Sequence, residues 1–199
     1  MSFWESLLPI LSDNTKESKK HAMECLEVFP SYFEKRWLNE KFKQYGVLNR
    51  DLSTLKIRMD EIPVSLAIAQ AAKETGWGTS RFALKGNALF GQWTWSGEGL
   101  KPKEAEKNEG HKVMKFNILQ ASVRAYQRNI NTHSSYQDFR LARAKLRDLG
   151  ESLDSMILSS FLDKYAETGK LYGWTVFLGF ASIPFFVQLG ILNLSNTIL

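Results

Sequence analysis

Cysteine and histidine are scarce in this chain of 199 residues, which contains one of the former and three of the latter. The single cysteine, Cys25, excludes an intrachain disulfide, and it lies in a helical pattern in which a thiol packs as a small hydrophobe. The histidines, His21, His111 and His133, do not have the spacing of a zinc site. We therefore expect neither a disulfide framework nor a metal centre.

Long runs of lysine and arginine are also missing, although the net charge is +5 and the pI is about 9.2. A mildly basic surface favours polyanions such as an acidic cell-wall polymer, but the charge alone selects no partner. Nothing else in the sequence supports nucleic-acid binding. Aromatic residues are abundant, with 6 Trp, 6 Tyr and 13 Phe, and Trp and Tyr beside polar residues suit flat ligands such as sugars.

Charged residues are absent from Leu171 to Leu199. The stretch 174–194 is about long enough to span a bilayer, but Pro184 weakens it as a helix. Packed core, membrane anchor and aberrant C-terminus are three interpretations of this tail. At the other end, the first residues do not follow the secretory pattern, because Glu5 interrupts the start and no small-residue cleavage site follows.

Apolar periodicity predicts a mainly helical chain. We expect one or two amphipathic helices over 15–47, with Pro30 as a break and Gly46 as a stop, and then a connecting stretch over 48–62. Later helices are predicted over 117–133 with Asn117 as the N-cap, 136–150 and 151–169. Glycines punctuate 87–116, where "HKVMKF" alternates as a strand does, so we expect a loop and a short β-hairpin there.

The best-defined element is "DEIPVSLAIAQAAKETG", residues 60–76. Asp60 is a plausible N-cap, Pro63 fits the first turn, and Gly76 ends the helix. The segment is nearly all apolar, which predicts a buried helix. Gln70 and Glu74 are four residues apart and project from the same side.

Glu74 lies in the last turn of this helix. The partial negative charge of the helix C-terminus and burial beside Trp77 both disfavour ionisation, which raises the pKa and suits a general acid. Acids at helix ends are common, however, so a surface carboxylate remains an alternative at this point.

A second carboxylate is normal in glycoside hydrolysis. The hairpin offers four candidates, although a solvated charged loop explains each of them equally well: Glu98, Glu104, Glu106 and Glu109. Tyr165 is either an active-site phenol or the last buried aromatic of its helix. Other hydrolase plans fit poorly, since the chain has no G-x-S-x-G motif and no phosphate-binding loop.

The block "RMDEIPVSLAIAQAAKETGWGTSRFALKGNALFGQW", residues 58–93, resembles the signature of the Bax-type bacterial glucosaminidases. These are peptidoglycan N-acetylglucosaminidases of glycoside hydrolase family 73. The shared motif is A-Q-A-A-x-E-[ST]-G-W-G-x-S-R-F followed by G-N-x-L-F-G-x-W, and further stretches such as "KYAETGKLY" extend the likeness over roughly residues 3–172.

This resemblance implies a mainly α, lysozyme-like α+β fold, in which a helical domain and one small β-hairpin lobe flank a substrate groove. It implies an endo-β-N-acetylglucosaminidase that hydrolyses the β-1,4 bond after N-acetylglucosamine in peptidoglycan. The expected divisions are an N-terminal helical extension (1–57), the catalytic domain (58–172) and the apolar tail (173–199). A lytic transglycosylase on the same fold and a non-catalytic cell-wall glycan-binding protein are the alternatives.

The resemblance also implies roles for individual residues. Glu74 matches the catalytic acid, and Tyr165 corresponds to the tyrosine of the family's late helix. Position favours Glu109 as the second carboxylate ahead of Glu106, unless the N-acetyl group of the substrate takes that role. The expected substrate-binding residues are Gln70, Trp77, Asn87, Phe90, Gly91 and Trp93.

The expected partners and location follow from the same family. We expect a monomer that binds peptidoglycan glycan strands, needs neither a metal nor an organic cofactor, and does not bind nucleic acid. The bacterial cell envelope is the expected location, periplasmic or associated with the inner membrane, and the tail 173–199 is the part that would contact a membrane.

Overall fold

The computed structural model describes residues 32–95, 98–101, 112–165, 172 and 176. Over this part the chain is mainly helical with one small antiparallel sheet, so the predicted fold class is confirmed. The helices are, in chain order, α3 (Tyr32–Gln44), α4 (Leu52–Arg58), α5 (Val64–Thr75), α6 (Arg81–Gly86), α7 (Leu119–Thr132), α8 (Gln137–Asp148) and α9 (Ser155–Ser159). The strands are β1 (Trp93–Thr94), β2 (Gly99–Leu100) and β3 (Lys112–Met114).

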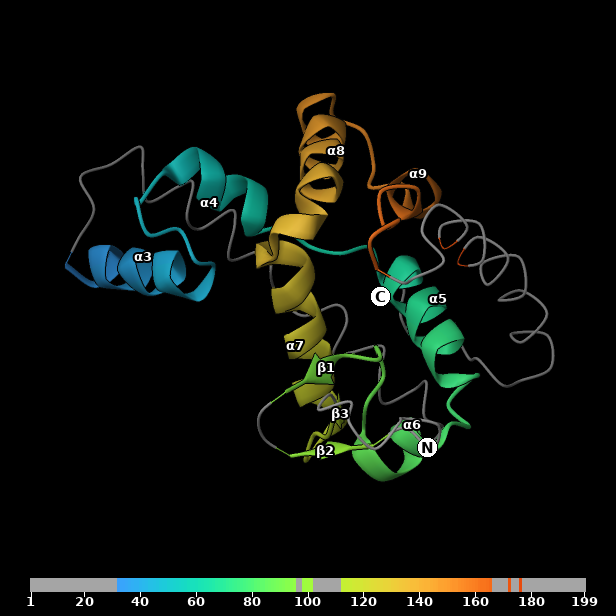
Figure 1. Ribbon diagram of the computed structural model, residues 1–199. Helices are drawn as coiled ribbons and strands as arrows, with labels where there is room; N and C mark the ends of the chain where they lie inside the picture. The colour runs from blue at the N-terminus through green and yellow to red at the C-terminus, as the bar shows by residue number, and fades with distance from the viewer. Residues whose placement is uncertain (1–31, 96–97, 102–111, 166–171, 173–175, 177–199) are drawn as a thin grey trace, which may run out of the picture.

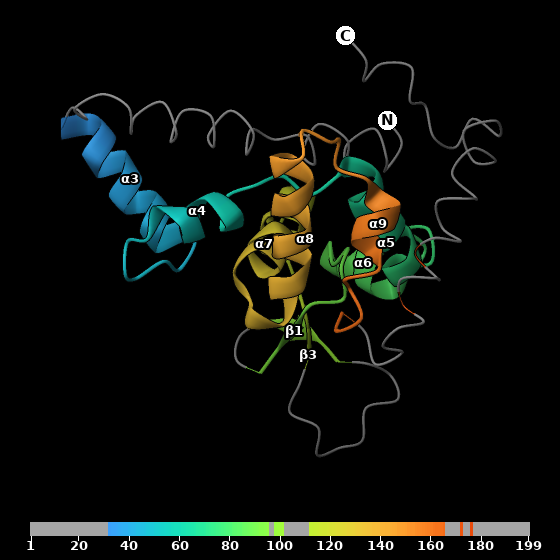
Figure 2. The ribbon, with the colours of Figure 1, turned by 90° about the horizontal axis from the view of Figure 1, so that it is seen from above.

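Helices α7 and α8 form a central column in Figure 1. Helices α3 and α4 lie on one side of it, and α5, α6 and α9 lie on the other. The turned view in Figure 2 keeps the same separation. The small sheet lies at the end of α7 that is remote from α8 (Figure 1).

The sheet contains one strand more than the predicted hairpin. β3 is the central strand, and both β1 and β2 pair with it in antiparallel fashion. Val113 of β3 lies opposite both Trp93 and Leu100 and is buried. The two short edge strands therefore share one partner, which holds them together despite their length.

Two predicted helix caps are wrong. Helix α5 begins at Val64 with Pro63 in the cap position, whereas Asp60 is buried and contacts arginines of α8. Helix α7 begins at Leu119 with Ile118 as the cap residue, so Asn117 does not cap it. The predicted end of α5 at Gly76 is confirmed, because that residue takes the left-handed conformation and its N–H closes the helix.

Two predicted boundaries also change. The stretch 48–62, predicted as a connection, contains α4, whose first turn is capped by the Asp51 carboxylate at 2.8 Å from the Thr54 amide. The helix predicted over 151–169 is short, and α9 covers Ser155–Ser159. Cys25 and the expected helix before Tyr32 lie outside the described residues.

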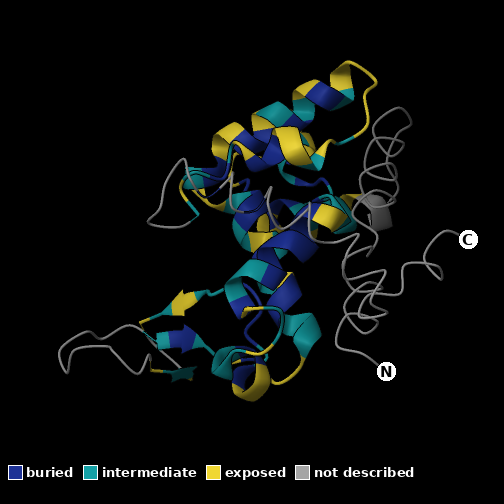
Figure 3. Ribbon diagram, turned by 90° about the vertical axis from the view of Figure 1, so that its right-hand side faces the viewer, coloured by how far each residue is buried: buried dark blue, intermediate teal, exposed yellow. Residues whose placement is uncertain are grey.

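The main hydrophobic core is built around α5. This helix buries eight of its twelve residues, which confirms the expected buried helix. Figure 3 colours the buried residues dark blue, and a run of them lies in the middle of the view. A second core joins the N-terminal helices through Phe42, Tyr45, Val47, Leu55 and Met59. Of the apolar tail, Val176 is described, and it is buried in the main core. Within the described residues, no helix combines the length and apolar character that crossing a membrane requires.

Arg143 of α8 fixes the segment between α4 and α5. Its side chain is fully buried, and its Nη1 and Nη2 atoms donate to the carbonyls of Ile57 at 2.9 Å, Asp60 at 3.2 Å and Glu61 at 2.9 Å. The same guanidinium donates to Asn131 Oδ1 at 2.9 Å, and its Nε lies 3.8 Å from the Asp60 carboxylate. These contacts position the start of α5 against the central column.

We expect Arg143→Ala to lower the free energy of unfolding by about 3–5 kcal/mol, because the buried Asp60 carboxylate and several carbonyls lose their donor. Urea unfolding followed by circular dichroism measures this loss. Arg124→Ala is the matched control on the exposed face of α7, and we expect a change within about 0.5 kcal/mol. Equal losses in the two variants would contradict the role given to Arg143.

Candidate active site

The end of α5 is a sharp turn that fixes the position of Glu74. Thr75 Oγ1 donates to the Ala71 carbonyl at 2.6 Å and accepts from the Gly78 amide at 2.8 Å. Gly76, Trp77 and Gly78 all have positive φ angles of 55°, 60° and 82°. A positive φ is rare for a bulky residue, and Trp77 is held in it by packing against the main core.

The two carboxyl oxygens of Glu74 have different surroundings. Oε1 accepts a hydrogen bond from the Tyr172 hydroxyl at 2.9 Å. Oε2 faces the backbone of Gly91, where a Cβ atom would lie 3.1 Å from it. Because Gly91 also has φ of +60°, a side chain at this position would be strained as well as crowded. The site thus combines one oxygen held by a phenol with one beside a residue that lacks a side chain.

A buried row of hydrogen bonds leads to Glu74 from the central column. The Tyr126 hydroxyl of α7 donates to Gln70 Oε1 at 2.6 Å, and Gln70 Nε2 donates to the Tyr172 hydroxyl oxygen at 3.1 Å. Gln70 and Glu74 therefore do project from the same side of α5, as their spacing predicts. Both are hydrogen-bonded to the same hydroxyl group.

Burial raises the pKa of the Glu74 carboxyl above its usual value. The hydrogen bond from Tyr172 and the positive charge of Lys73 oppose this shift and keep it smaller than burial alone would make it. The direction predicted from the sequence is confirmed. Burial also raises the pKa of the Tyr172 hydroxyl, with a further increase from the Glu74 charge, so the phenol keeps its proton and remains a donor.

Lys73 lies over the ring of the same phenol. Its Nζ atom lies 3.8 Å from the centroid of the Tyr172 ring, which is a cation–π contact. Burial lowers the pKa of Lys73, and the Glu74 charge opposes that change. The lysine therefore places a positive charge beside Glu74 while packing on the ring that hydrogen-bonds it.

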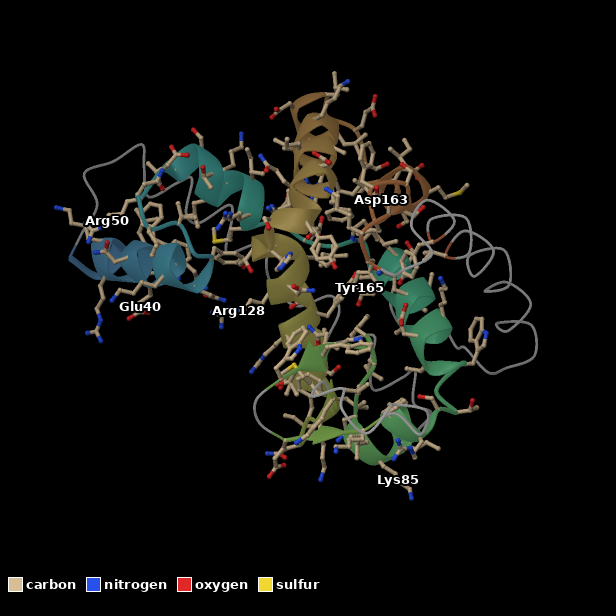
Figure 4. The ribbon with its side chains drawn as sticks, viewed as in Figure 1. Glu40, Arg50, Lys85, Arg128, Asp163 and Tyr165 are labelled. Atoms are coloured by element: carbon tan, nitrogen blue, oxygen red, sulfur yellow. The ribbon has the colours of Figure 1, made fainter. Side chains whose placement is uncertain are left out.

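Tyr165, predicted as a catalytic residue, donates its hydroxyl hydrogen to a backbone carbonyl, whereas Tyr172 donates to Glu74. Its hydroxyl donates to the Phe90 carbonyl at 2.8 Å, and its ring stacks on that of Tyr172 with centroids 5.2 Å apart. Figure 4 shows Tyr165 between α5 and α7. Tyr165 therefore supports the ring of Tyr172, and the hydroxyl that contacts Glu74 belongs to Tyr172.

The expected substrate-binding residues fall into two groups. Gln70 and Phe90 are buried, at 0% and 2% exposure, so neither side chain reaches the surface. Asn87 is half-buried, and its amide donates to the Phe116 carbonyl at 2.9 Å, which holds the turn after α6. Trp93 of β1 is 47% exposed, and Trp77 and Gly91 are half-buried. Contact between a glycan and Trp77, Gly91 or Trp93 stays a prediction.

The candidates for a second carboxylate differ in what the structure describes. Glu98 is exposed beside β2. Glu104, Glu106 and the preferred Glu109 lie outside the described residues. In the part of the chain that the structure describes, the hydrogen-bonding partner of Glu74 is a tyrosine, and the identity of a second acid stays a prediction.

Sequence reasoning missed Tyr126 and Tyr172 as site residues. Both carried a signal that was available in principle, because a tyrosine in a core position of a helix needs a partner for its hydroxyl, as does a glutamine in an apolar helix. The partners are 56 and 102 residues away from Gln70 along the chain, which no local pattern can identify.

Comparison with known proteins identifies the class. The glucosaminidase family model, described as mannosyl-glycoprotein endo-β-N-acetylglucosaminidase, matches residues 54–170. This is more than half of the chain, which therefore belongs to the glucosaminidase family, a family of glycan-cleaving enzymes. The match contains all the elements from α5 to α9 and Tyr165, and Tyr172 lies just beyond it.

A particular relative is the Protein bax of Escherichia coli (strain K12). It is 36% identical over 120 residues, which cover 60% of this chain and 42% of that protein. The chain thus matches less than half of the relative's length. No solved structure matches the chain significantly.

We expect Tyr172→Phe to raise the pKa of the Glu74 carboxyl further, because the variant removes a hydrogen bond that favours the carboxylate. Tyr165→Phe removes a hydroxyl from the adjacent ring and should leave that pKa unchanged. NMR titration of ¹³C-labelled glutamate carboxyls, with the Glu74 signal assigned by its loss in Glu74→Gln, measures both. A shift of the same size in the two variants would contradict the assignment of Tyr172 as the donor.

Proposed function

We propose that this protein hydrolyses β-1,4 glycosidic bonds after N-acetylglucosamine in peptidoglycan, with Glu74 as the general acid. The observation that carries the proposal is a partly buried carboxyl at the end of a buried helix, with Oε1 accepting a hydrogen bond from Tyr172 and Oε2 facing Gly91. Burial raises the pKa of this carboxyl, which agrees with the role of an acid. Membership of the glucosaminidase family supports the reaction class. The resemblance of residues 58–93 to the Bax-type peptidoglycan glucosaminidases and the basic net charge support a bacterial wall polymer as the substrate.

The hydrogen bonds define where the acidic proton is held. Oε1 accepts from Tyr172, so the proton of the neutral carboxyl sits on Oε2, which faces Gly91. From there it passes to the glycosidic oxygen as the bond to the anomeric carbon breaks. Tyr172 then stabilises the carboxylate that is left. Water adds to the anomeric carbon, which yields one reducing sugar end and one alcohol.

The group on the other side of the sugar is either a hairpin carboxylate or the N-acetyl group of the substrate. Glu109 is our first choice, ahead of Glu106, Glu104 and Glu98. Trp77 and Trp93, the tryptophans that flank the helix end and the β lobe, would stack on sugar rings. We place the protein in the bacterial cell envelope as a monomer.

We expect Glu74→Gln to lower the hydrolysis of purified peptidoglycan strands by about 10²–10⁴-fold, because the amide cannot supply the proton. Gln keeps the acceptor for Tyr172 and nearly the same volume, so folding should be intact. Glu151→Gln, an exposed change after α8, is the matched control and should retain activity. Mass spectrometry of borohydride-reduced fragments should identify reducing N-acetylglucosamine ends.

Other products would identify the alternatives. Fragments that end in an anhydro sugar would indicate a lytic transglycosylase. Binding to sacculi without release of fragments would indicate a glycan-binding protein. Undiminished hydrolysis by Glu74→Gln would remove Glu74 from the mechanism.

A further inference from the structure

Gln70 is a buried polar residue whose position does not fit a role in contacting the glycan. Its side chain is fully buried one helical turn before Glu74. Its oxygen accepts from Tyr126 at 2.6 Å and its nitrogen donates to Tyr172 at 3.1 Å. The amide is therefore used inside the protein, and its role must be sought there.

The chemistry of the amide gives the row of hydrogen bonds one direction. An amide oxygen only accepts, so Tyr126 must donate to Gln70 Oε1. An amide nitrogen only donates, so the Tyr172 oxygen accepts from Gln70 Nε2. The Tyr172 hydroxyl therefore donates its hydrogen to Glu74 Oε1, with the two oxygens 2.9 Å apart.

We propose that Gln70 is a positioning residue that makes Tyr172 the hydrogen-bond donor to Glu74. A reversed amide would present its oxygen to Tyr172, which would then donate to Gln70 and leave Glu74 without that hydrogen bond. Tyr126 prevents the reversal. Its side chain is 1% exposed, so its hydroxyl hydrogen would be left in the core without the acceptor that Gln70 Oε1 supplies. Gln70 thus acts on Glu74 through Tyr172.

This inference rests on the proposed function for its catalytic meaning, but the hydrogen bonds can be tested without it. The other groups that act on Glu74 stay in place in the test variants. Lys73 on the same helix contributes a positive charge that lowers the pKa of Glu74. Tyr136 and Tyr165 also face Glu74, whose charge raises the pKa of both hydroxyls.

The first experiment is a double-mutant cycle of Gln70→Met and Tyr172→Phe, read by ¹³C NMR titration of the Glu74 carboxyl without substrate. We expect Gln70→Met to raise the pKa of Glu74, because Tyr172 is no longer held as its donor. In the Tyr172→Phe background, Gln70→Met should add no further shift. An undiminished shift in that background would overturn the proposal.

Two further variants separate positioning from a loss of stability. Tyr126→Phe removes the group that fixes the amide and should shift the pKa of Glu74 in the same direction by less. This variant carries the test if Gln70→Met does not fold. Ser122→Ala is the matched control, since its buried hydroxyl accepts from the Leu89 amide at 3.1 Å and does not belong to the row of hydrogen bonds that joins Tyr126, Gln70 and Tyr172. It should lower stability without moving the titration. A shift in Ser122→Ala equal to that in Tyr126→Phe would overturn the proposal.

Kinetics on glycan strands add a second readout. Gln70→Met should lower kcat about tenfold, the effect of weakening one hydrogen bond to a charged group, and leave KM within about twofold. A higher KM with unchanged kcat would instead show that Gln70 contacts the substrate, and would overturn the proposal. If the wild type does not cleave glycans but the titration cycle behaves as expected, the proposed function fails and the positioning role stands.

Discussion

The structure of the site depends on the partial burial of one carboxyl group at the end of an apolar helix. Glu74 is rigid because α5 is buried along most of its length and ends abruptly in three residues with positive φ. Burial favours the protonated form, and the hydrogen bond from Tyr172 favours the carboxylate. The balance between the two leaves the pKa of Glu74 raised above its usual value, which is the direction that a general acid requires.

The rest of the fold supports this balance from two sides. The Arg143 guanidinium holds the backbone that leads into α5 through three carbonyl groups. These hydrogen bonds position the start of the helix that carries Glu74 at its other end. On the other side, a cluster of tyrosine rings from α7 and the C-terminal part packs against α5. Tyr126 stacks on Phe90 with centroids 3.9 Å apart, and Tyr165 stacks on Tyr172. These rings exclude water and also supply the hydroxyl groups that reach Gln70 and Glu74.

The sequence predicted what local pattern can determine. The buried helix, its end at Gly76, the shared side of Gln70 and Glu74 and the raised pKa of the acid all follow from nearby residues, and the structure confirms them. One prediction that was wrong concerns a residue with distant partners. Asp60 is a reasonable cap by sequence, but its carboxylate contacts Arg143 and Arg147, more than eighty residues away. The catalytic role of Tyr165 stays a prediction, and no periodicity indicates that the hydroxyl of Tyr172, seven residues further along the chain, is the one that reaches Glu74.

The most direct test of the account is the pH dependence of kcat/KM on peptidoglycan strands for the wild type and Tyr172→Phe. A general acid works in its protonated form, so activity should fall as pH rises through the pKa of Glu74, and the raised pKa extends activity to higher pH. Because Tyr172→Phe raises that pKa further, the alkaline limb should move to higher pH in the variant. An alkaline limb that stays in place while the pKa of Glu74 moves would contradict the account.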